Sequence, residues 1–400
     1  MKKILLLLWA LLVLQLAGCE KDAAATGTTS AGAEPIVAYS LPVPPEDRNQ
    51  SFLHYAFVET VDGYYFENNQ VIYFCPRDQL KCVPLCCKPN CEHKDDDCNA
   101  RGYGLGYYDG SLYTVRPSFG DDLHFELLKV NADGTGCEVV KTMENLEGYS
   151  FSFTTHHGKA FFVYGPDGNM PLEEQKTRLV VMDLLDYSLT EPAADYLQTA
   201  ILPDINSYYK DKLYLNEAYD ENWTYRPDKE KLIELDAVTG RARTVYSGCA
   251  SAIYVTDSVL YFMEPDSKAV TDMFGVEMIE GNPGFREVNL ETGAVKDCGP
   301  VADGALYATY DENYIYVRSA PRNEGRDQTV YIYSRDYKLV DQLELTDGLE
   351  IFNITSDRVF FYKWNGSNRS VTCCLEKAKI GSGSLTLDPV EFVAAGRAAG

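Results

Sequence analysis

The sequence contains none of the short motifs that identify the common classes of enzyme active site. We find no HExxH, no GxSxG, no Walker phosphate-binding loop and no repeated Asp-box among its 400 residues. The corresponding metallopeptidase, hydrolase and nucleotide-binding sites are therefore not expected. Runs with the 3.6-residue period of a helix are almost absent too, and the one candidate is Val270 to Ile279. This scarcity argues against a helical fold.

Positive charge is also in short supply. Lysine and arginine total 36 against 60 aspartates and glutamates, which gives a formal net charge of −24. A field of this sign repels nucleic acid and anionic lipid head groups, so we expect no nucleic-acid partner. Cationic partners, divalent ions and neutral ligands are compatible with it. After the first 18 residues, no apolar run approaches the ~18 residues of a membrane span.

The N-terminus has the pattern of a secretion signal. Two lysines are followed by an apolar run over residues 4–14, and then by small residues immediately before Cys19. A run this short indicates a processing segment rather than a transmembrane helix. The small residues before the cysteine resemble the bacterial lipobox, which implies acylation of Cys19; an ordinary cleaved signal is the alternative. An acylated Cys19 predicts lipid attachment to the cell membrane and an extracytoplasmic location.

The chain is expected to comprise three segments. Residues 1–18 are predicted to be a lipoprotein signal peptide, and residues 19–34 to be the lipidated cysteine with a flexible tether. The tether sequence EKDAAATGTTSAGAE is small and polar, a composition typical of flexible linkers. Residues 35–400 exceed the size of one simple core, which suggests either two domains or a repeat architecture.

A short motif recurs along residues 35–400. It consists of a turn pair, a β-branched or leucine position, and one or two aromatic residues. Successive copies lie 45 to 55 residues apart, close to the ~40–50 residues of a propeller blade. The aromatic residues that mark the copies are Tyr65, Tyr113, Phe161, Tyr214, Tyr261, Tyr316 and Phe361.

Each period also contains a second hairpin, in which alternating apolar residues flank an Asp, Asn or Gly turn. Residues 232–246, LIELDAVTGRARTVY, are one example. One period therefore predicts four strands. Seven such units predict an all-β chain folded as a seven-bladed β-propeller, which makes residues 35–400 a single domain. Two packed β-sandwiches, or a ring of six or eight blades, are the alternatives.

Connection lengths differ strongly along each period. Turns within hairpins are minimal, whereas loops from the aromatic strand to the outer hairpin are long, as at 216–230 and 264–284. In an up-and-down blade these loops share a face with the connectors between blades, and we expect binding there. Aromatic rings among acids suit a protein or carbohydrate partner, although rings that fold down to cap the blades are the alternative. The ligand-binding candidates are Tyr219, Trp223, Tyr225, Phe274 and Trp364.

The most unusual stretch is VPLCCKPNCEHKDDDCN at 83–99, in the connector after the first unit. Cys86, Cys91, His93 and Cys98 supply three thiols and one imidazole, a normal donor set for structural zinc. Such an ion would hold together a loop that has little apolar surface to bury. One or two disulfides among Cys86, Cys87, Cys91 and Cys98, with a solvated His93, are a strong alternative in an exported chain. A loop with neither metal nor disulfide is the third possibility.

The cysteine count bears on the same question. With Cys19 acylated, eleven of the twelve cysteines remain. An odd number cannot all pair with one another, so at least one must be free, acylated or bound to metal. Outside the 83–99 stretch, Cys75 and Cys82 flank a predicted turn and are in position to face each other across a hairpin.

The same loop resembles a known group of proteins. Its segment LCCKPNCEH, from Leu85 to His93, is followed by CNA at 98–100. This pattern resembles the LCxKPxCxH…CNA signature of uncharacterised bacterial β-propeller lipoproteins, related at fold level to TolB-like propellers. Cys87 occupies the variable position, so the resemblance carries over Cys86, Cys91, His93 and Cys98. It implies the fold and the location, and no activity.

These features predict a lipid-anchored β-propeller at the cell surface that acts as a binding scaffold for an unidentified ligand. One alternative is an extracytoplasmic glycan-processing enzyme, which would need inward carboxylates clustered on several first strands. The other is a metal or redox sensor centred on the Cys/His loop. No catalytic residue is assigned.

Overall fold

The chain divides into two units, Met1–Ser40 and Leu41–Gly400, and the computed structural model describes residues of the second. The predicted signal peptide, the tether and Cys19 lie outside the described residues. The described residues are 41, 44, 47, 50–51, 56–94, 97–118, 124–144, 149–166, 176–192, 194–197, 204–217, 230–264, 267–272, 275–280, 284–319, 327–365 and 368–393.

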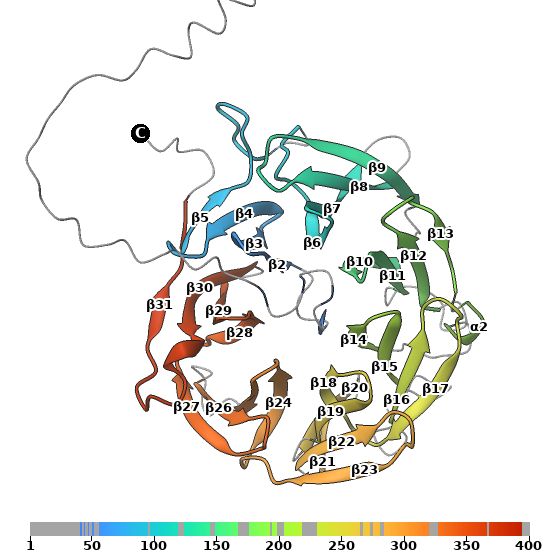
Figure 1. Cartoon of the computed structure of the whole chain (residues 1–400), viewed down its shortest axis with the longest axis vertical. Coiled ribbons are helices and arrows are strands. Elements are labelled where there is room, and N and C mark those ends of the chain that lie inside the picture. Colours follow the sequence, from blue (N-terminus) through green and yellow to red (C-terminus); the bar gives the residue numbers. More distant parts are fainter. Residues whose placement is uncertain are drawn as a thin grey trace, which may run out of the picture. The chain divides into compact units, whose positions relative to one another are not determined.

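Residues 56–393 form a seven-bladed β-propeller, as the sequence predicts (Figure 1). Each blade is an antiparallel sheet whose four strands follow chain order from the centre of the ring to its rim. Blades 1 to 4 consist of β2 (Phe57–Glu59), β3 (Gly63–Asn68), β4 (Val71–Pro76) and β5 (Lys81–Pro84); β6 (Tyr103–Tyr108), β7 (Ser111–Ser118), β8 (His124–Asn131) and β9 (Cys137–Glu144); β10 (Tyr149–His156), β11 (Lys159–Pro166), β12 (Arg178–Asp183) and β13 (Leu189–Thr190); and β14 (Asp204–Tyr209), β15 (Lys212–Glu217), β16 (Lys231–Asp236) and β17 (Ala242–Ser247).

The remaining three blades follow the same plan, with a hairpin inserted in blade 5. Helix α2 (Ala194–Leu197) follows β13 and lies in the connection from blade 3 to blade 4. A short 3₁₀ turn, Lys377–Lys379, follows β30 in blade 7. Blades 5 to 7 consist of β18 (Ser251–Val255), β19 (Val259–Glu264), β22 (Gly284–Asn289) and β23 (Val295–Gly299); β24 (Ala305–Tyr310), β25 (Tyr314–Ser319), β26 (Gln328–Ser334) and β27 (Leu339–Leu345); and β28 (Glu350–Ile354), β29 (Arg358–Asn365), β30 (Asn368–Glu376) and β31 (Leu387–Pro389).

The repeated aromatic residue explains why the units pack side by side. All seven marker residues lie on the second strand of their blade, and six of them are at most 3% exposed. A buried aromatic ring removes about 150–250 Å² from water, which stabilises the fold by roughly 1.5–3 kcal/mol per side chain. One such ring per blade supplies a repeated hydrophobic contact around the ring.

The turns between first and second strands are as tight as the sequence predicts. In blade 2 the turn residues Asp109 and Gly110 have φ of 46° and 76°, and in blade 3 His157 and Gly158 have φ of 49° and 72°. Two consecutive positive φ values are the mark of a type I′ turn, whose twist matches that of the flanking strands. The glycine at the second position adopts this conformation without the cost of a Cβ.

The ring is closed by a C-terminal strand. β32 (Glu391–Phe392) pairs in parallel with β5 and becomes a fifth strand on blade 1. The ring of Phe392 contacts Phe66 and Tyr73, with centroids 5.8 and 5.0 Å apart. The chain therefore passes from blade 7 to blade 1, where these aromatic contacts anchor β32.

At the other end of the described chain, β1 (Gln50–Ser51) pairs with β14, the innermost strand of blade 4. The inserted hairpin of blade 5 consists of β20 (Ser267–Asp272) and β21 (Gly275–Glu280). The helical exception that the sequence indicated at Val270 to Ile279 is therefore wrong, because residues 270–272 and 275–279 belong to these two antiparallel strands. Among the described residues, no helix is long and apolar enough to cross a membrane.

Candidate metal centre

The four residues predicted as metal or disulfide ligands converge on one point. The ligand atoms of Cys86, Cys91, His93 and Cys98 all lie within 4.8 Å of one another. Ligands about 2.3 Å from a tetrahedral metal lie about 3.8 Å apart, so a small contraction of the cluster would accommodate an ion. Cys98 is buried and the other three are half-buried. The cluster thus has a buried floor and a partly exposed rim.

The loop reverses direction at two residues with left-handed backbone. Asn90 has φ of 59° and His93 has φ of 57°. Asparagine and histidine are among the non-glycine residues that adopt this conformation most readily. The amide of Cys91 donates to the carbonyl of Lys88 at 3.3 Å, which closes the first reversal. These local turns bring residues on both sides of the reversal back toward Cys86.

Both ends of the loop are attached to the same residue of blade 1. Ile72 on β4 accepts a 2.8 Å hydrogen bond from the amide of Leu85 and donates a 2.7 Å bond to the carbonyl of Ala100. Arg101, which forms a β-bridge with Val71, also donates a side-chain hydrogen bond to the carbonyl of Lys94 inside the loop. The outer edge of β4 therefore sets the entry and the exit of the loop. In Figure 1 this connector projects from the rim of the ring.

Blade 2 supports the loop from the other side. Gly134, in the turn between β8 and β9, has φ of 74°. A Cβ on Gly134 would lie 3.0 Å from the carbonyl carbon of Leu85 and 3.3 Å from the amide nitrogen of Cys86. The side chain of Asn99 also donates to the carbonyl of Gly134, at 3.4 Å. Cys86, the first of the four ligands along the chain, therefore lies against the backbone of the β8–β9 turn, at the junction of blades 1 and 2.

The electrostatics of the cluster favour a cation. Burial raises the pKa of the Cys98 thiol well above its usual range, against a smaller lowering by the backbone of Ala100, and the nearby thiols of Cys86 and Cys91 raise it further. His93 Nδ1 lies 3.3 Å from Cys98 Sγ. Three thiolates this close would repel one another. A divalent cation bound between them would offset that repulsion by attracting all three.

The aromatic candidates fall into two groups. Trp364, near the end of β29, is 44% exposed. Its ring packs edge-on against Tyr362, with centroids 5.9 Å apart. The others, Tyr219, Trp223, Tyr225 and Phe274, lie outside the described residues. Of the five candidates, the described residues therefore include one, and its ring is exposed near the end of β29.

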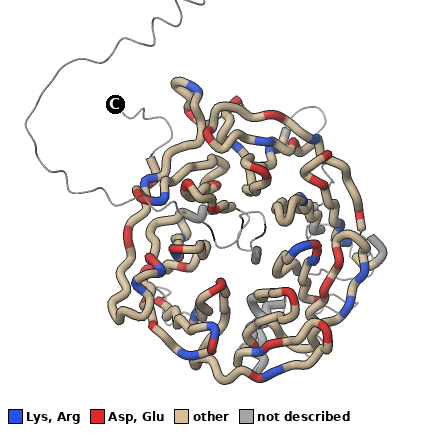
Figure 2. Tube along the Cα trace, in the orientation of Figure 1, with Lys and Arg blue, Asp and Glu red and all other residues tan. Residues whose placement is uncertain are grey.

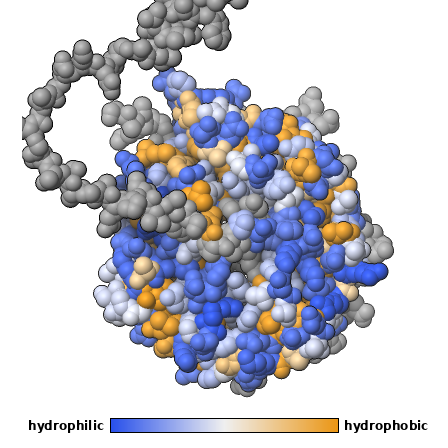
Figure 3. All heavy atoms as spheres, in the orientation of Figure 1, coloured by the Kyte–Doolittle hydropathy of each residue, from blue (hydrophilic) through white to orange (hydrophobic). Residues whose placement is uncertain are grey.

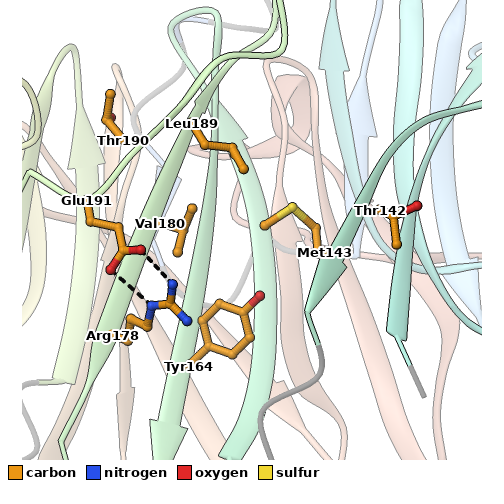
Figure 4. A pocket seen from close by; sticks show the side chains of 8 residues that line it. All are labelled: Thr142, Met143, Tyr164, Arg178, Val180, Leu189, Thr190 and Glu191. Atoms are coloured by element: carbon orange, nitrogen blue, oxygen red, sulfur yellow. Dashed lines mark hydrogen bonds and ion pairs between the residues drawn. The ribbon is translucent and has the colours of Figure 1, made fainter. Parts of the chain in front are cut away.

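Sequence reasoning missed a pocket of about 420 Å³ between blades 2 and 3. Figure 4 shows Met143 of β9 facing side chains from β11, β12 and the end of blade 3. Arg178 forms a two-bond ion pair with Glu191, at 3.0 and 2.5 Å, and its guanidinium lies 5.8 Å from the centre of the Tyr164 ring. The lining residues are Thr142, Met143, Tyr164, Arg178, Val180, Leu189, Thr190 and Glu191.

The two charged residues that line the pocket, Arg178 and Glu191, are paired with each other. The hydrogen bonds from Arg178 lower the pKa of Glu191, so the acid is ionised and its charge is matched by the arginine. The remaining walls are largely apolar. Nothing in the sequence marks this pair, because Arg178 and Glu191 meet only through the pairing of β12 with β13 and lie beside a methionine from another blade.

Comparisons with known proteins agree on the fold. No family model matches the sequence, and no curated protein matches it. A structure from a study of two prolyl endopeptidases matches with a TM-score of 0.52 and 11% identity, over 86% of this chain and 50% of that chain. This chain thus spans about half the length of that protein.

Two further solved structures are similar at lower scores. An oligogalacturonate lyase in complex with manganese has a TM-score of 0.47 and 10% identity, over 82% of this chain and 90% of that chain. TolB from Acinetobacter baumannii has a TM-score of 0.37 and 12% identity, over 76% of this chain and 65% of that chain. TolB and other β-propeller proteins are thus among the structures similar to this chain. At these identities the likeness concerns the fold alone.

Proposed function

We propose that this chain is a lipid-anchored, extracytoplasmic binding scaffold that displays a zinc-clipped loop at the junction of blades 1 and 2. The observation that carries the proposal is the convergence of Cys86, Cys91, His93 and Cys98 within 4.8 Å. Three thiolates and one imidazole are the ligand types that zinc prefers, and a four-ligand set closes a structural site. Hard cations such as magnesium and calcium prefer oxygen ligands and fit this set poorly.

The tip of the loop, residues 87–94, needs a bound ion to stabilise it because it buries little apolar surface. Leu85 is buried before the tip, and Cys98 to Ala100 are buried after it. Between them, residues 87–90 are all exposed, as are Glu92 and Lys94. Folding such a segment costs conformational entropy that little apolar burial offsets. The free energy of metal binding supplies the missing stabilisation.

A rigid and exposed loop on a propeller suits recognition of another molecule. Loops held by a fixed scaffold commonly carry binding residues. Acidic and basic residues are interspersed along the chain around the ring (Figure 2). On the face shown in Figure 3, hydrophobic residues form small separate patches. A polar surface of this kind favours a protein or carbohydrate partner bound by charged and polar groups at the loops rather than by one large apolar area.

The inner strands give less support to the glycan-processing alternative. Among the described first strands of the seven blades, the acids are Glu59, Asp204 and Glu350. Glu59 is paired with Arg77 at 3.1 Å, and Glu350 is paired with Arg318 at 2.6 Å. Hydrolysis of a glycosidic bond usually needs two carboxylates that flank the same bond. Glu59 and Glu350, the two of these acids whose side chains are described, are each paired with an arginine and do not form such a carboxylate pair.

Metal content and thiol reactivity test the loop. The full chain, exported and purified in mild detergent without chelator, should contain about one zinc per molecule. Chelation should release the zinc and expose Cys86, Cys91 and Cys98 to a maleimide. Cys86→Ser should lose the zinc, whereas the adjacent Cys87→Ser should keep it, because Cys87 is exposed and its thiol donates to the carbonyl of Asp133. Absence of zinc, with these thiols unreactive until reduced, would identify a disulfide staple instead.

Membrane attachment and partner binding need separate tests. Cys19→Ala should move the protein from the membrane fraction to the soluble fraction, and the N-terminal peptide should lose the mass of its acyl groups. A photo-crosslinker at Lys88 should give a partner adduct that disappears in Cys86→Ser and persists in Cys87→Ser. An adduct of equal yield in both variants would separate partner binding from the metal.

A further inference from the structure

We propose that Cys75 and Cys82 form a disulfide between β4 and β5, and that this bond secures the strand that closes the ring. The site is distinct from the metal centre and does not depend on it. Both cysteines are fully buried, and the pairing of β4 with β5 places them opposite each other. Two cysteines that face each other on adjacent strands, in a chain proposed to be exported, are positioned for oxidation.

The strand register places the two residues opposite each other. β4 and β5 are antiparallel, with Tyr73 opposite Pro84 and Phe74 opposite Val83. One further step sets Cys75 opposite Cys82. Because Ile72 directs both its N–H and its C=O toward the outer side of β4, alternation along the strand turns the polar groups of Cys75 the other way, toward β3.

Cys75 and Cys82 therefore occupy a non-hydrogen-bonded pair. Two observations agree with this assignment. Pro84 opposes Tyr73 at the equivalent position, where its missing N–H costs no hydrogen bond. The carbonyl of Cys82 accepts from the amide of Val393 at 2.9 Å and so points away from β4. In such a pair the Cα atoms lie about 4.5 Å apart, within the range of about 4.4–6.8 Å that a disulfide spans.

The position of β5 gives the bond a structural role. β5 is held to β4 by two residue pairs and carries β32 on its other edge. The amides of Glu391 and Val393 donate to the carbonyls of Leu80 and Cys82, at 3.0 and 2.9 Å. A covalent link from Cys82 to Cys75 would fix β5 in place, and β5 in turn orders the closing strand.

A third buried thiol defines the competing possibility. Cys374 of β30 in blade 7 is fully buried and lies near Cys82. Arg358 donates to its sulfur at 3.7 Å, which gives that thiol a polar partner of its own. The register aligns Cys75 with Cys82 within one blade, whereas a link to Cys374 would join two blades.

The chemistry is a thiol–disulfide exchange with an external disulfide, R–S–S–R, such as oxidised glutathione. One cysteine releases its proton to solvent and its thiolate attacks the external disulfide, displacing R–S⁻, which is then protonated. The second cysteine also loses its proton, and its thiolate attacks the mixed disulfide and displaces the second R–S⁻. Two cysteine thiols are thereby oxidised to one disulfide, and R–S–S–R is reduced to two R–SH. Because both sulfurs are buried in the folded ring, the exchange belongs to folding, before β32 docks.

Peptide mapping of the full chain tests the proposal. The protein is refolded from urea with reduced and oxidised glutathione, denatured in N-ethylmaleimide without reduction, and digested with trypsin and chymotrypsin. Cleavage at Arg77, Lys81 and Leu85 leaves Cys75 and Cys82 in separate peptides, and leaves Cys82 apart from Cys86. We expect the two peptides to be joined until a reductant separates them. Maleimide on both residues, or a link from either one to Cys374, would overturn the proposal.

Thermal unfolding provides a second measurement. A reductant should lower the melting temperature of the oxidised protein, and this shift should be lost in Cys75→Val and in Cys82→Val. Cys373→Ser serves as the control because it removes a neighbouring thiol of β30 and should retain the shift. An equal shift of the melting temperature in the natural protein and all three variants would place the redox-sensitive bond elsewhere. Zinc content, measured on the same samples, should be unchanged, so failure of this proposal is distinguishable from failure of the metal centre.

Discussion

Arg77 of blade 1 forms a 2.8 Å ion pair with Asp357 of blade 7. Arg77 follows β4, and Asp357 lies in the tight turn between β28 and β29. The same guanidinium reaches Glu59 at 3.1 Å, and Tyr64 donates to Asp357 at 2.7 Å. Residues from opposite ends of the described chain therefore share one polar network at the seam where the ring closes.

Removing Arg77 should destabilise the whole ring. The side chain of Glu59 is 0% exposed, so Arg77→Met would leave a buried carboxylate without its cation, at a cost of about 3–5 kcal/mol. Urea unfolding followed by circular dichroism measures the loss. Arg178→Met is the matched control, because the Arg178–Glu191 pair is considerably more exposed, and its removal should change stability by about 0–1 kcal/mol. Equal losses of stability in the two variants would show that the ion pairs of Arg77 contribute no more than an exposed pair does.

The same network predicts an acid sensitivity. Burial acts to raise the pKa of Asp357, but the hydrogen bond from Tyr64 and the charge of Arg77 outweigh it and hold the pKa below the ordinary value of 3.8. The stabilisation is therefore fully present above about pH 4 and is lost as the pH falls through the folded-state pKa. Urea unfolding between pH 5 and pH 2 should show a smaller decline for Asp357→Asn than for the natural protein. Asp347→Asn, which alters an exposed acid, should decline like the natural protein.

Gly134→Ala should weaken metal binding without unfolding the propeller. The added Cβ would meet the backbone of Leu85 at 3.0 Å and displace the chain next to Cys86. Loss of support around a metal site typically lowers affinity by about 10–100-fold, and competition with a chromophoric chelator measures it. Gly293→Ala is the control, because Gly293 has a similar φ of 71° and nothing within 4 Å of the added Cβ. Unchanged affinity in Gly134→Ala would show that blade 2 does not support the loop.

A second buried ion pair connects blades 6 and 7. Lys377 lies 2.7 Å from Asp311, and their side chains are 5% and 2% exposed. Lys377→Met should cost about 3–5 kcal/mol, because it leaves Asp311 buried without a cation. Lys296→Met, at the more exposed pair with Glu287, should cost about 0–1 kcal/mol. Urea unfolding of both variants makes the comparison, and a loss below about 1 kcal/mol in Lys377→Met would contradict the role assigned to the pair.

Local features of the fold were predictable because they repeat. The period of 45 to 55 residues, the aromatic markers and the turn residues identify seven four-stranded units. The segment from Val270 to Ile279 was misjudged because a short insertion has no second copy to establish its period. The pocket at Arg178 and Glu191 was missed because its walls come from two blades.

The sequence by itself determined the strand pattern and the ligand set of the candidate metal centre. Both are local properties: hydrophobic alternation and turn chemistry act over a few residues, and all four ligands lie within one short loop. Only the tertiary structure decided what those parts meet. The docking of Gly134 against Leu85, the pairing of β32 with β5 and the contact of Arg77 with Asp357 join residues from different blades. Such contacts depend on register and packing around the closed ring, which no local pattern specifies.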